Sequence, residues 1–113
     1  MERVPRLDET TALAVYRIFQ EATANAMRHA NATILQVFLG ASDAALMLTV
    51  RDNGDGFDPA QQDPDSGVGL ELMRQRARSI GATLEIESAP GRGTNLVLTV
   101  PLPPTDPAQG DSP

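Results

Sequence analysis

The sequence predicts an α+β fold, a two-layer sandwich in which helices lie on one face of a mostly antiparallel, mixed sheet. Two stretches have the apolar spacing of amphipathic helices, and four shorter stretches are rich in strand-forming residues. The strands come as two adjacent pairs, and each pair follows one helix. This order favours hairpins over the strict strand–helix alternation that builds parallel sheets.

Size and composition predict one globular domain over residues 1–102, followed by a disordered tail at 103–113 that is rich in Pro, Asp and Gly. The net charge of −6 argues against direct nucleic-acid binding, and the absence of cysteine excludes thiol chemistry. No apolar run is long enough to span a bilayer. We therefore expect a cytoplasmic domain, linked to a membrane only through other parts of a parent protein.

The first helix is predicted from Asp8 or Thr10, either of which can cap it, to about Ala30, with Asn31 as its terminator. Its expected core-facing stripe is Leu13, Tyr16, Phe19, Ala22 and Ala26, widened by Ala12, Val15 and Ile18.

The first hairpin is predicted to join strands 33–39 and 45–52 through a turn that starts at Gly40. In the second strand Leu46, Leu48 and Val50 lie on one face and alternate with Met47, Thr49 and Arg51 on the other, so we expect the hairpin to bury one face.

A long loop at 53–67, rich in Asp, Gly and Pro, is predicted to be mobile and to act as a lid or binding loop. A helix at 68–80, ended by Gly81, should follow it, and strands 82–88 and 94–100 then form the second hairpin.

The segment Asp52-Asn53-Gly54-Asp55-Gly56-Phe57 carries the first chemical signal. An ionised carboxylate accepts hydrogen bonds only, so Asp52 at a strand end suits the exocyclic amine of adenine. The two glycines permit close approach of the base. The same letters also suit an acidic surface turn, whereas an EF-hand calcium loop needs oxygen ligands where these glycines stand.

The second signal is Gly67-Val68-Gly69-Leu70, which opens the second helix. Free backbone N–H groups and the positive end of the helix dipole make such a start an anion site. The chain has no P-loop sequence, and a Rossmann fingerprint would need a third glycine.

The third signal lies on one face of the first helix. Asn25 is a hard oxygen ligand suited to Mg²⁺, Glu21 is an acid, and Arg28 and His29 are potential phosphate partners. Taken alone, this set is better explained as an ordinary solvated polar face.

As an ordered set over residues 8–102, these motifs resemble the catalytic and ATP-binding (HATPase_c) domain of two-component sensor histidine kinases in the GHKL superfamily. The stretch from Glu21 to His29 looks like the N box, Asp52 to Phe57 like the G1 box, and Gly67 to Leu70 like the G2 box. Gly91-Arg92-Gly93-Thr94 resembles the closing glycine–threonine motif. The short lid and the Arg28-His29-Ala30 ending resemble the branch that pairs with LuxR-type response regulators.

The resemblance implies a Bergerat fold that binds ATP and Mg²⁺. It implies Asn25 on the metal, Arg28 and His29 near phosphates, and Asp52 on the adenine amine, with Gly54, Gly56, Phe57 and Thr94 around the base. It also implies Gly67, Val68, Gly69 and Leu70 at the phosphates, under the lid.

The resemblance further implies that Glu21 occupies the position of the water-activating acid of related ATPases, a catalytic role that is less defined in a histidine kinase. The single histidine, His29, lies in the nucleotide helix, so the phosphoacceptor is expected on a separate dimerisation domain. We expect this fragment to bind ATP with little self-phosphorylation. The alternatives are a free-standing GHKL ATPase, an anti-sigma-factor-type serine kinase, and a degenerate protein-binding module.

Overall fold

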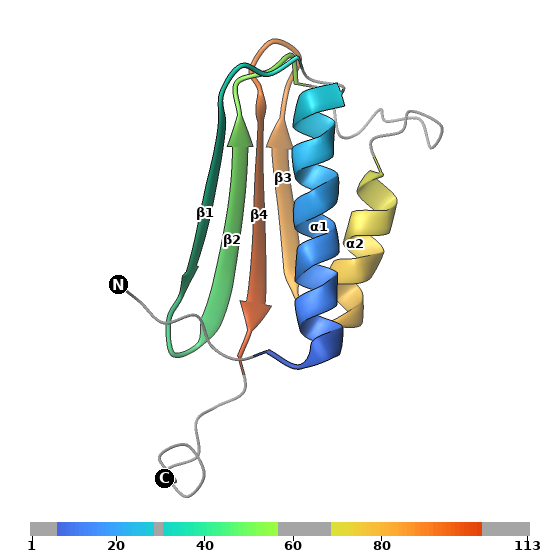
Figure 1. The fold of residues 1–113 in the computed structure, drawn as a ribbon, viewed down its shortest axis with the longest axis vertical. Coiled ribbons are helices and arrows are strands. Elements are labelled where there is room, and N and C mark those ends of the chain that lie inside the picture. The colour runs from blue at the N-terminus through green and yellow to red at the C-terminus, as the bar shows by residue number, and fades with distance from the viewer. Residues whose placement is uncertain (1–6, 29–30, 57–68, 103–113) are drawn as a thin grey trace, which may run out of the picture.

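A computed structural model describes residues 7–28, 31–56 and 69–102. Residues 57–67 of the predicted lid loop and the tail at 103–113 therefore lie outside the described residues. The elements, in chain order, are α1 (Glu9–Arg28), β1 (Leu35–Ala41), β2 (Ala45–Asp52), α2 (Leu70–Ser79), β3 (Thr83–Ser88) and β4 (Thr94–Pro101). Both helices lie on one face of the sheet, which confirms the predicted two-layer α+β class (Figure 1).

The four described strands form one sheet in the order β1-β2-β4-β3, and every neighbouring pair is antiparallel. The first strand starts and ends two residues later than predicted. Gly40 pairs with Met47, so it lies inside the ladder and not in the turn. The turn is confined to residues 42–44, where the Ser42 hydroxyl accepts hydrogen bonds from the backbone N–H groups of Ala44 and Ala45, both at 3.2 Å.

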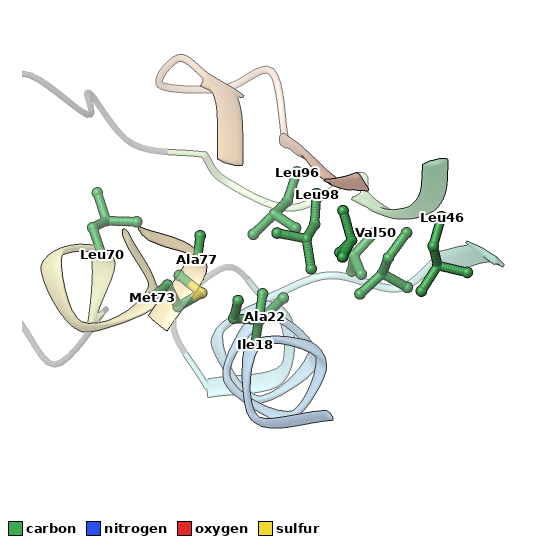
Figure 2. Close-up of a cluster of buried hydrophobic side chains, with 11 residues drawn as sticks. Ile18, Ala22, Leu46, Val50, Leu70, Met73, Ala77, Leu96 and Leu98 are labelled. Atoms are coloured by element: carbon green, nitrogen blue, oxygen red, sulfur yellow. The ribbon is translucent and has the colours of Figure 1, made fainter. Parts of the chain in front are cut away.

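The core lies between the sheet and the two helices. The predicted alternation is confirmed, because Leu46, Leu48 and Val50 of β2 are buried, as are Leu96, Leu98 and Val100 of β4. Figure 2 shows sheet side chains pointing toward Ile18 and Ala22 of α1, and Met73 and Ala77 of α2 beside them. This packing fixes where the ends of the strands and helices stand relative to one another.

The predicted core stripe of α1 was wrong in part. Ala14, Ile18, Ala22 and Ala26 are buried and the predicted Val15 and Phe19 pack against the core, whereas Leu13 and Tyr16 are each 53% exposed. A spacing of four residues places the three alanines and Ile18 along one line of the helix. Small side chains let the helix pack close to the sheet, and the bulky pair is left on the solvent side.

The start of α1 is capped by Asp8 and not by Thr10. The Asp8 Oδ1 atom accepts a hydrogen bond from the backbone N–H of Thr11 at 2.7 Å. This bond to the backbone and that to the Thr11 side chain hold the pKa of the Asp8 carboxyl below its usual value. Such capping satisfies one of the free N–H groups of the first turn.

The expectation that the first hairpin buries one face was wrong for β1. Val37 is 46%, Phe38 63% and Leu39 46% exposed, although they point alternately to the two faces. The strand forms the edge of the sheet farthest from the helices, so its helix-side residues have little above them in the described structure (Figure 1). Strand composition alone does not reveal an edge position.

The end of α1, the end of β2 and the start of β4 all lie at one end of the molecule (Figure 1). The polar residues singled out in the sequence are carried by these ends. Neither described helix combines the length and apolarity that crossing a bilayer would require.

Candidate functional site

Asp52 is the last residue of β2 and is half-buried. Its Oδ1 atom accepts a hydrogen bond from the Gly54 N–H at 2.8 Å, which closes a tight turn directly after the strand. The turn uses one carboxylate oxygen, and among the described residues the second oxygen, Oδ2, accepts no hydrogen bond. The β2–β4 register places Thr94 directly opposite Asp52.

Thr94 is linked to the third strand through Ser88. The two hydroxyl oxygens are 2.9 Å apart, and the Ser88 hydroxyl donates to the Gly93 carbonyl, also at 2.9 Å. Because a serine hydroxyl has one hydrogen, the Thr94 hydroxyl is the donor of the pair and keeps lone pairs for accepting. A carboxylate and a hydroxyl are thus held as neighbouring acceptors at the ends of two paired strands.

Hydrogen bonds hold the segment after Asp52 at Asn53, Gly54 and Asp55, which are the first residues of the loop predicted to be mobile. The Asn53 side-chain oxygen accepts from the N–H groups of Thr33 and Ile34 at 3.0 and 2.9 Å, and its amide donates to the Thr33 hydroxyl at 2.9 Å. Asn31, at a φ of 53°, donates from Nδ2 to Asp55 Oδ2 at 3.0 Å. These bonds fasten the turn to the chain that leaves α1.

Two glycines allow this turn to touch the loop between β3 and β4. Gly56 has a φ of 70°, and a Cβ there would overlap the Ala89 carbonyl oxygen. Gly93 has a φ of 73°, and a Cβ there would overlap the Asp52 carbonyl oxygen. The Gly91 N–H donates to the Asp55 carbonyl at 2.5 Å. Backbone therefore packs on backbone beside Asp52, which only glycine permits.

The polar face of α1 carries the second group of predicted residues. Arg28 Nη2 lies 3.8 Å from Glu21 Oε2, with side-chain exposures of 60% and 25%. Asn25 lies one turn after Glu21, and its side-chain amide oxygen is buried. A carboxylate, a cation and a hard amide oxygen therefore share one side of the helix near its end.

Gly69 joins this face to the start of α2. It caps the helix in the left-handed conformation, φ 70° and ψ 26°, and among the described residues no side chain caps the first turn. A Cβ at Gly69 would lie 3.2 Å from Glu21 Oε2. The start of α2 therefore lies beside Glu21, and the N–H groups of a helix's first turn, which lack partners within the helix, are donors that can bind an anion. The Leu70 side chain is buried in the core, so only its backbone can serve such a site.

The structure brings the predicted residues together in two groups. One group is Asp52, Gly54, Gly56 and Thr94, which adjoins a surface hollow of about 330 Å³ bordered also by Arg51 and Arg92. The other group is Glu21, Arg28 and Gly69, with Asn25 on the same helix face. His29, Phe57, Gly67 and Val68 lie outside the described residues.

Sequence reasoning missed two supporting residues, Asn53 and Ser88. Each fixes a neighbour by hydrogen bonds and presents no charge, so neither stands out in a search for chemistry. A signal was present for Asn53, because an Asn next to Asp52 and Gly54 is a frequent turn residue whose side chain bonds to the backbone.

Known proteins share this fold and much of this sequence. Residues 10–104 match the family described as histidine kinase-, DNA gyrase B-, and HSP90-like ATPases. The sensor protein VraS of Staphylococcus aureus strain COL is 42% identical over 88 residues, which is 78% of this chain and 25% of the relative. The chain thus spans about a quarter of the length of this curated relative.

Two solved structures extend the likeness to the fold. The histidine kinase domain of a blue-light activated histidine kinase from Erythrobacter litoralis EL346 superposes with a TM-score of 0.69 at 26% identity, covering 82% of this chain and 45% of that one. The ATP binding domain of PrrB from Mycobacterium tuberculosis gives 0.66 at 31% identity, covering 80% and 68%. From its motifs, its fold and these matches, the chain belongs to the histidine kinase-, DNA gyrase B- and HSP90-like ATPases, as an ATP-binding domain of the sensor histidine kinase type.

Proposed function

We propose that this chain binds Mg²⁺–ATP and positions it for phosphoryl transfer to a histidine on a separate dimerisation domain. The observation that carries the proposal is the pair of acceptors, Asp52 opposite Thr94, at the same end of the fold as the polar face of α1. Phosphoryl transfer needs positioning and charge stabilisation more than covalent chemistry from the protein. An ATP-holding domain can therefore supply the donor while another domain supplies the acceptor.

At the base, Asp52 takes the adenine amine through the carboxylate oxygen that Gly54 leaves available. Thr94 stands beside it as a second acceptor, for the amine directly or through a water molecule. Gly54, Gly56 and Phe57 border the base. The support for this assignment is the fixed turn at 52–56, because a preorganised acceptor binds without first ordering the loop.

At the phosphates, the backbone N–H groups of Gly69 and Leu70 bind oxygen atoms with the help of the α2 dipole. Arg28 supplies a positive charge near them. His29, Gly67 and Val68 are assigned to the same end from the sequence. The support is the start of α2 at Gly69, where no side-chain cap is found among the described residues.

Mg²⁺ fits this end of the site through Asn25. The ion takes oxygen ligands, usually one or two from the protein with the rest from water and phosphate. The side-chain amide oxygen of Asn25 is a metal ligand of this type, buried on the same helix face as Arg28. When bound, the metal would neutralise developing charge on the phosphoryl oxygens. Asn25→Ala should weaken ATP binding in the presence of Mg²⁺ far more than in EDTA.

Glu21 is proposed as the acid next to the reacting end, since its carboxylate lies beside Gly69. In a free-standing ATPase the same acid would activate water. Glu21→Gln separates the two functions, because a histidine kinase domain should hydrolyse ATP slowly with or without the substitution. A fast ATPase activity that is lost in Glu21→Gln would favour the alternative.

The wider setting is also proposed. The parent protein would carry the phosphoacceptor domain, pass the phosphoryl group to a LuxR-type response regulator, and meet a membrane only through other segments. The support is the likeness to a sensor protein four times the length of the matched region.

Isothermal titration calorimetry with Mg²⁺–ATP tests the nucleotide site, and incubation with labelled ATP tests self-phosphorylation. We expect saturable one-to-one binding and no stable label on the protein. Strong, stable labelling of the isolated chain would show that it carries its own acceptor, against the proposal.

A further inference from the structure

Thr94, whose hydroxyl stands beside Asp52 in the proposed adenine site, is linked through that hydroxyl to Ser88 of the neighbouring strand β3. We propose that Ser88 is a positioning residue that contributes to base specificity. By accepting the Thr94 hydrogen, it makes the Thr94 hydroxyl an acceptor toward the base, which favours a purine with an amine at this edge over one with a carbonyl. The inference rests on the proposed function and deepens it, because it gives a role in choosing the base to a residue that acts through its neighbour.

A threonine hydroxyl does not by itself distinguish these two classes of base. It has one hydrogen and two lone pairs, and it rotates to donate to a carbonyl or to accept from an amine. The ionised Asp52 carboxylate can only accept, so it already favours the amine. Thr94 adds to that preference only if its own hydrogen is committed to another group.

Ser88 commits that hydrogen through two hydrogen bonds. The Ser88 Oγ atom lies 2.9 Å from the Gly93 carbonyl oxygen and 2.9 Å from the Thr94 Oγ1 atom. A carbonyl oxygen has no hydrogen to give, so the single hydrogen of Ser88 points to Gly93. The bond between the two hydroxyls then uses the Thr94 hydrogen, and Thr94 is left with lone pairs for a ligand.

The sheet holds these groups in a fixed row. Ser88 is the last residue of β3 and pairs with Thr94, the first residue of β4, which pairs in turn with Asp52, the last residue of β2. Side chains of directly paired residues stand next to each other on one face of a sheet. Both hydroxyls are partly buried, so water competes less for the bond between them. The row therefore presents two acceptors, Asp52 and Thr94, with Ser88 behind the second.

A purely structural role of Ser88 would have a different consequence. If Ser88 only closed the turn between β3 and β4, Ser88→Ala would loosen the site and weaken the binding of all purine nucleotides by the same factor. If Ser88 holds the Thr94 hydrogen, Ser88→Ala releases it, and Thr94 can then donate to the base carbonyl of inosine triphosphate. The two roles are separated by the ratio of the dissociation constants for inosine triphosphate and ATP.

Isothermal titration calorimetry measures this ratio, with inosine triphosphate titrated directly or as a competitor of ATP, both in the presence of Mg²⁺. We expect the unaltered chain to prefer ATP, and Ser88→Ala to lower the ratio by about 2- to 10-fold, which is the contribution of one neutral hydrogen bond. Ser42→Ala is the matched control, because the Ser42 hydroxyl also holds a turn between two strands, but at the opposite end of the sheet (Figure 1). It should leave both affinities unchanged. Thermal unfolding checks that each variant is folded.

Two further variants test whether Ser88 acts through Thr94. Ser88→Thr keeps the hydroxyl and should keep the ratio of the unaltered chain. In a chain that already carries Thr94→Val, adding Ser88→Ala should leave the ratio unchanged, because valine has no hydroxyl hydrogen to release. If Ser88→Ala does not fold, Ser88→Cys takes its place with the same expected fall, since a thiol is only a weak acceptor.

An unchanged ratio in the folded Ser88 variant that lacks the hydroxyl would overturn the inference. A fall of equal size in the Thr94→Val background would overturn it as well, because the effect would then not pass through Thr94. Absence of nucleotide binding by the unaltered chain would instead overturn the proposed function.

Discussion

Replacing Asp52 by asparagine exchanges one carboxylate oxygen for an amide NH₂ and preserves the shape of the side chain. The remaining oxygen can still accept the Gly54 N–H that now lies 2.8 Å from Oδ1, so the turn at 52–54 should survive. The new NH₂ group then faces the ligand. Because the adenine amine is also a donor, the variant removes an acceptor and places two donors against each other.

The size of the effect follows from the bond that is lost. A hydrogen bond to a charged group contributes about 1.5–3 kcal/mol, and each 1.4 kcal/mol is a factor of ten in the dissociation constant, so ATP should bind about 10- to 150-fold more weakly. Asp43→Asn removes the same charge from the exposed β1–β2 turn at the opposite end of the sheet and should leave ATP affinity unchanged. Inosine triphosphate has a carbonyl in place of the adenine amine. The Asp52→Asn substitution should therefore weaken its binding less than it weakens ATP binding, or should strengthen it.

Calorimetry on the unaltered chain and both variants checks these numbers, with thermal unfolding as the control for folding. An Asp52→Asn variant that is folded and binds ATP within about twofold of the unaltered chain would refute the assignment of Asp52 to the base, since less than about 0.4 kcal/mol would then depend on it.

Three further predictions concern the residues around Asp52 and the start of α1. Gly93→Ala should destabilise the fold by more than about 2 kcal/mol in denaturant unfolding, because strain at a φ of 73° adds to overlap with the Asp52 carbonyl. Gly91 has a similar φ but open space around its Cα, so Gly91→Ala should cost only about 1–2 kcal/mol. Equal losses of stability in the two variants would contradict the packing described. Thr94→Val should weaken ATP binding by about 2- to 10-fold in calorimetry. Thr99→Val, on the same strand but away from the site, should leave ATP binding unchanged. Equal ATP affinities for the unaltered chain and both variants would show that Thr94 is not part of the site. Asp8→Ala should lower Tm at pH 7, and the Tm difference should shrink as the pH falls below 3.8 and through the lowered pKa of the folded state. The reason is that a carboxylate whose pKa is lowered by folding stabilises the fold above that pH range and loses this contribution below it. A Tm difference that does not change with pH in circular dichroism melts would argue against an ionised cap.

The order of elements and the alternation in β2 and β4 could be predicted from the sequence because both depend on local patterns. The apolar residues Leu46, Leu48 and Val50 repeat every two positions. In a half-buried strand this repeat places all three on the face that meets the core. The start of each helix was also close, since the Asp8 side chain caps α1 and α2 begins directly after Gly69.

The faces of α1 and β1 could not be predicted in the same way. Two apolar stripes overlap on α1, and the spacing alone does not say which of them meets the sheet. The choice is made by close packing, which favours Ala14, Ile18 and Ala22 over the bulkier Leu13 and Tyr16. The exposure of β1 depends on its place at the sheet edge, which is a property of the whole topology.

In the candidate site, the sequence indicated the acceptor Asp52 and the glycines beside it, because these residue types are unusual in such a run. It did not indicate the pairing of Thr94 with Asp52 or with Ser88, since register is set by long-range strand pairing. It also assigned Leu70 to the phosphates, although its side chain belongs to the core and only its backbone is left for that role.

A crystal structure of the chain with Mg²⁺ and a non-hydrolysable ATP analogue tests the central claim most directly. The account predicts the adenine amine within hydrogen-bonding distance of Asp52 Oδ2, with phosphate oxygens at the backbone N–H groups of Gly69 and Leu70. A nucleotide bound elsewhere, for example against Arg51 and Arg92 with its base away from Asp52, would contradict it.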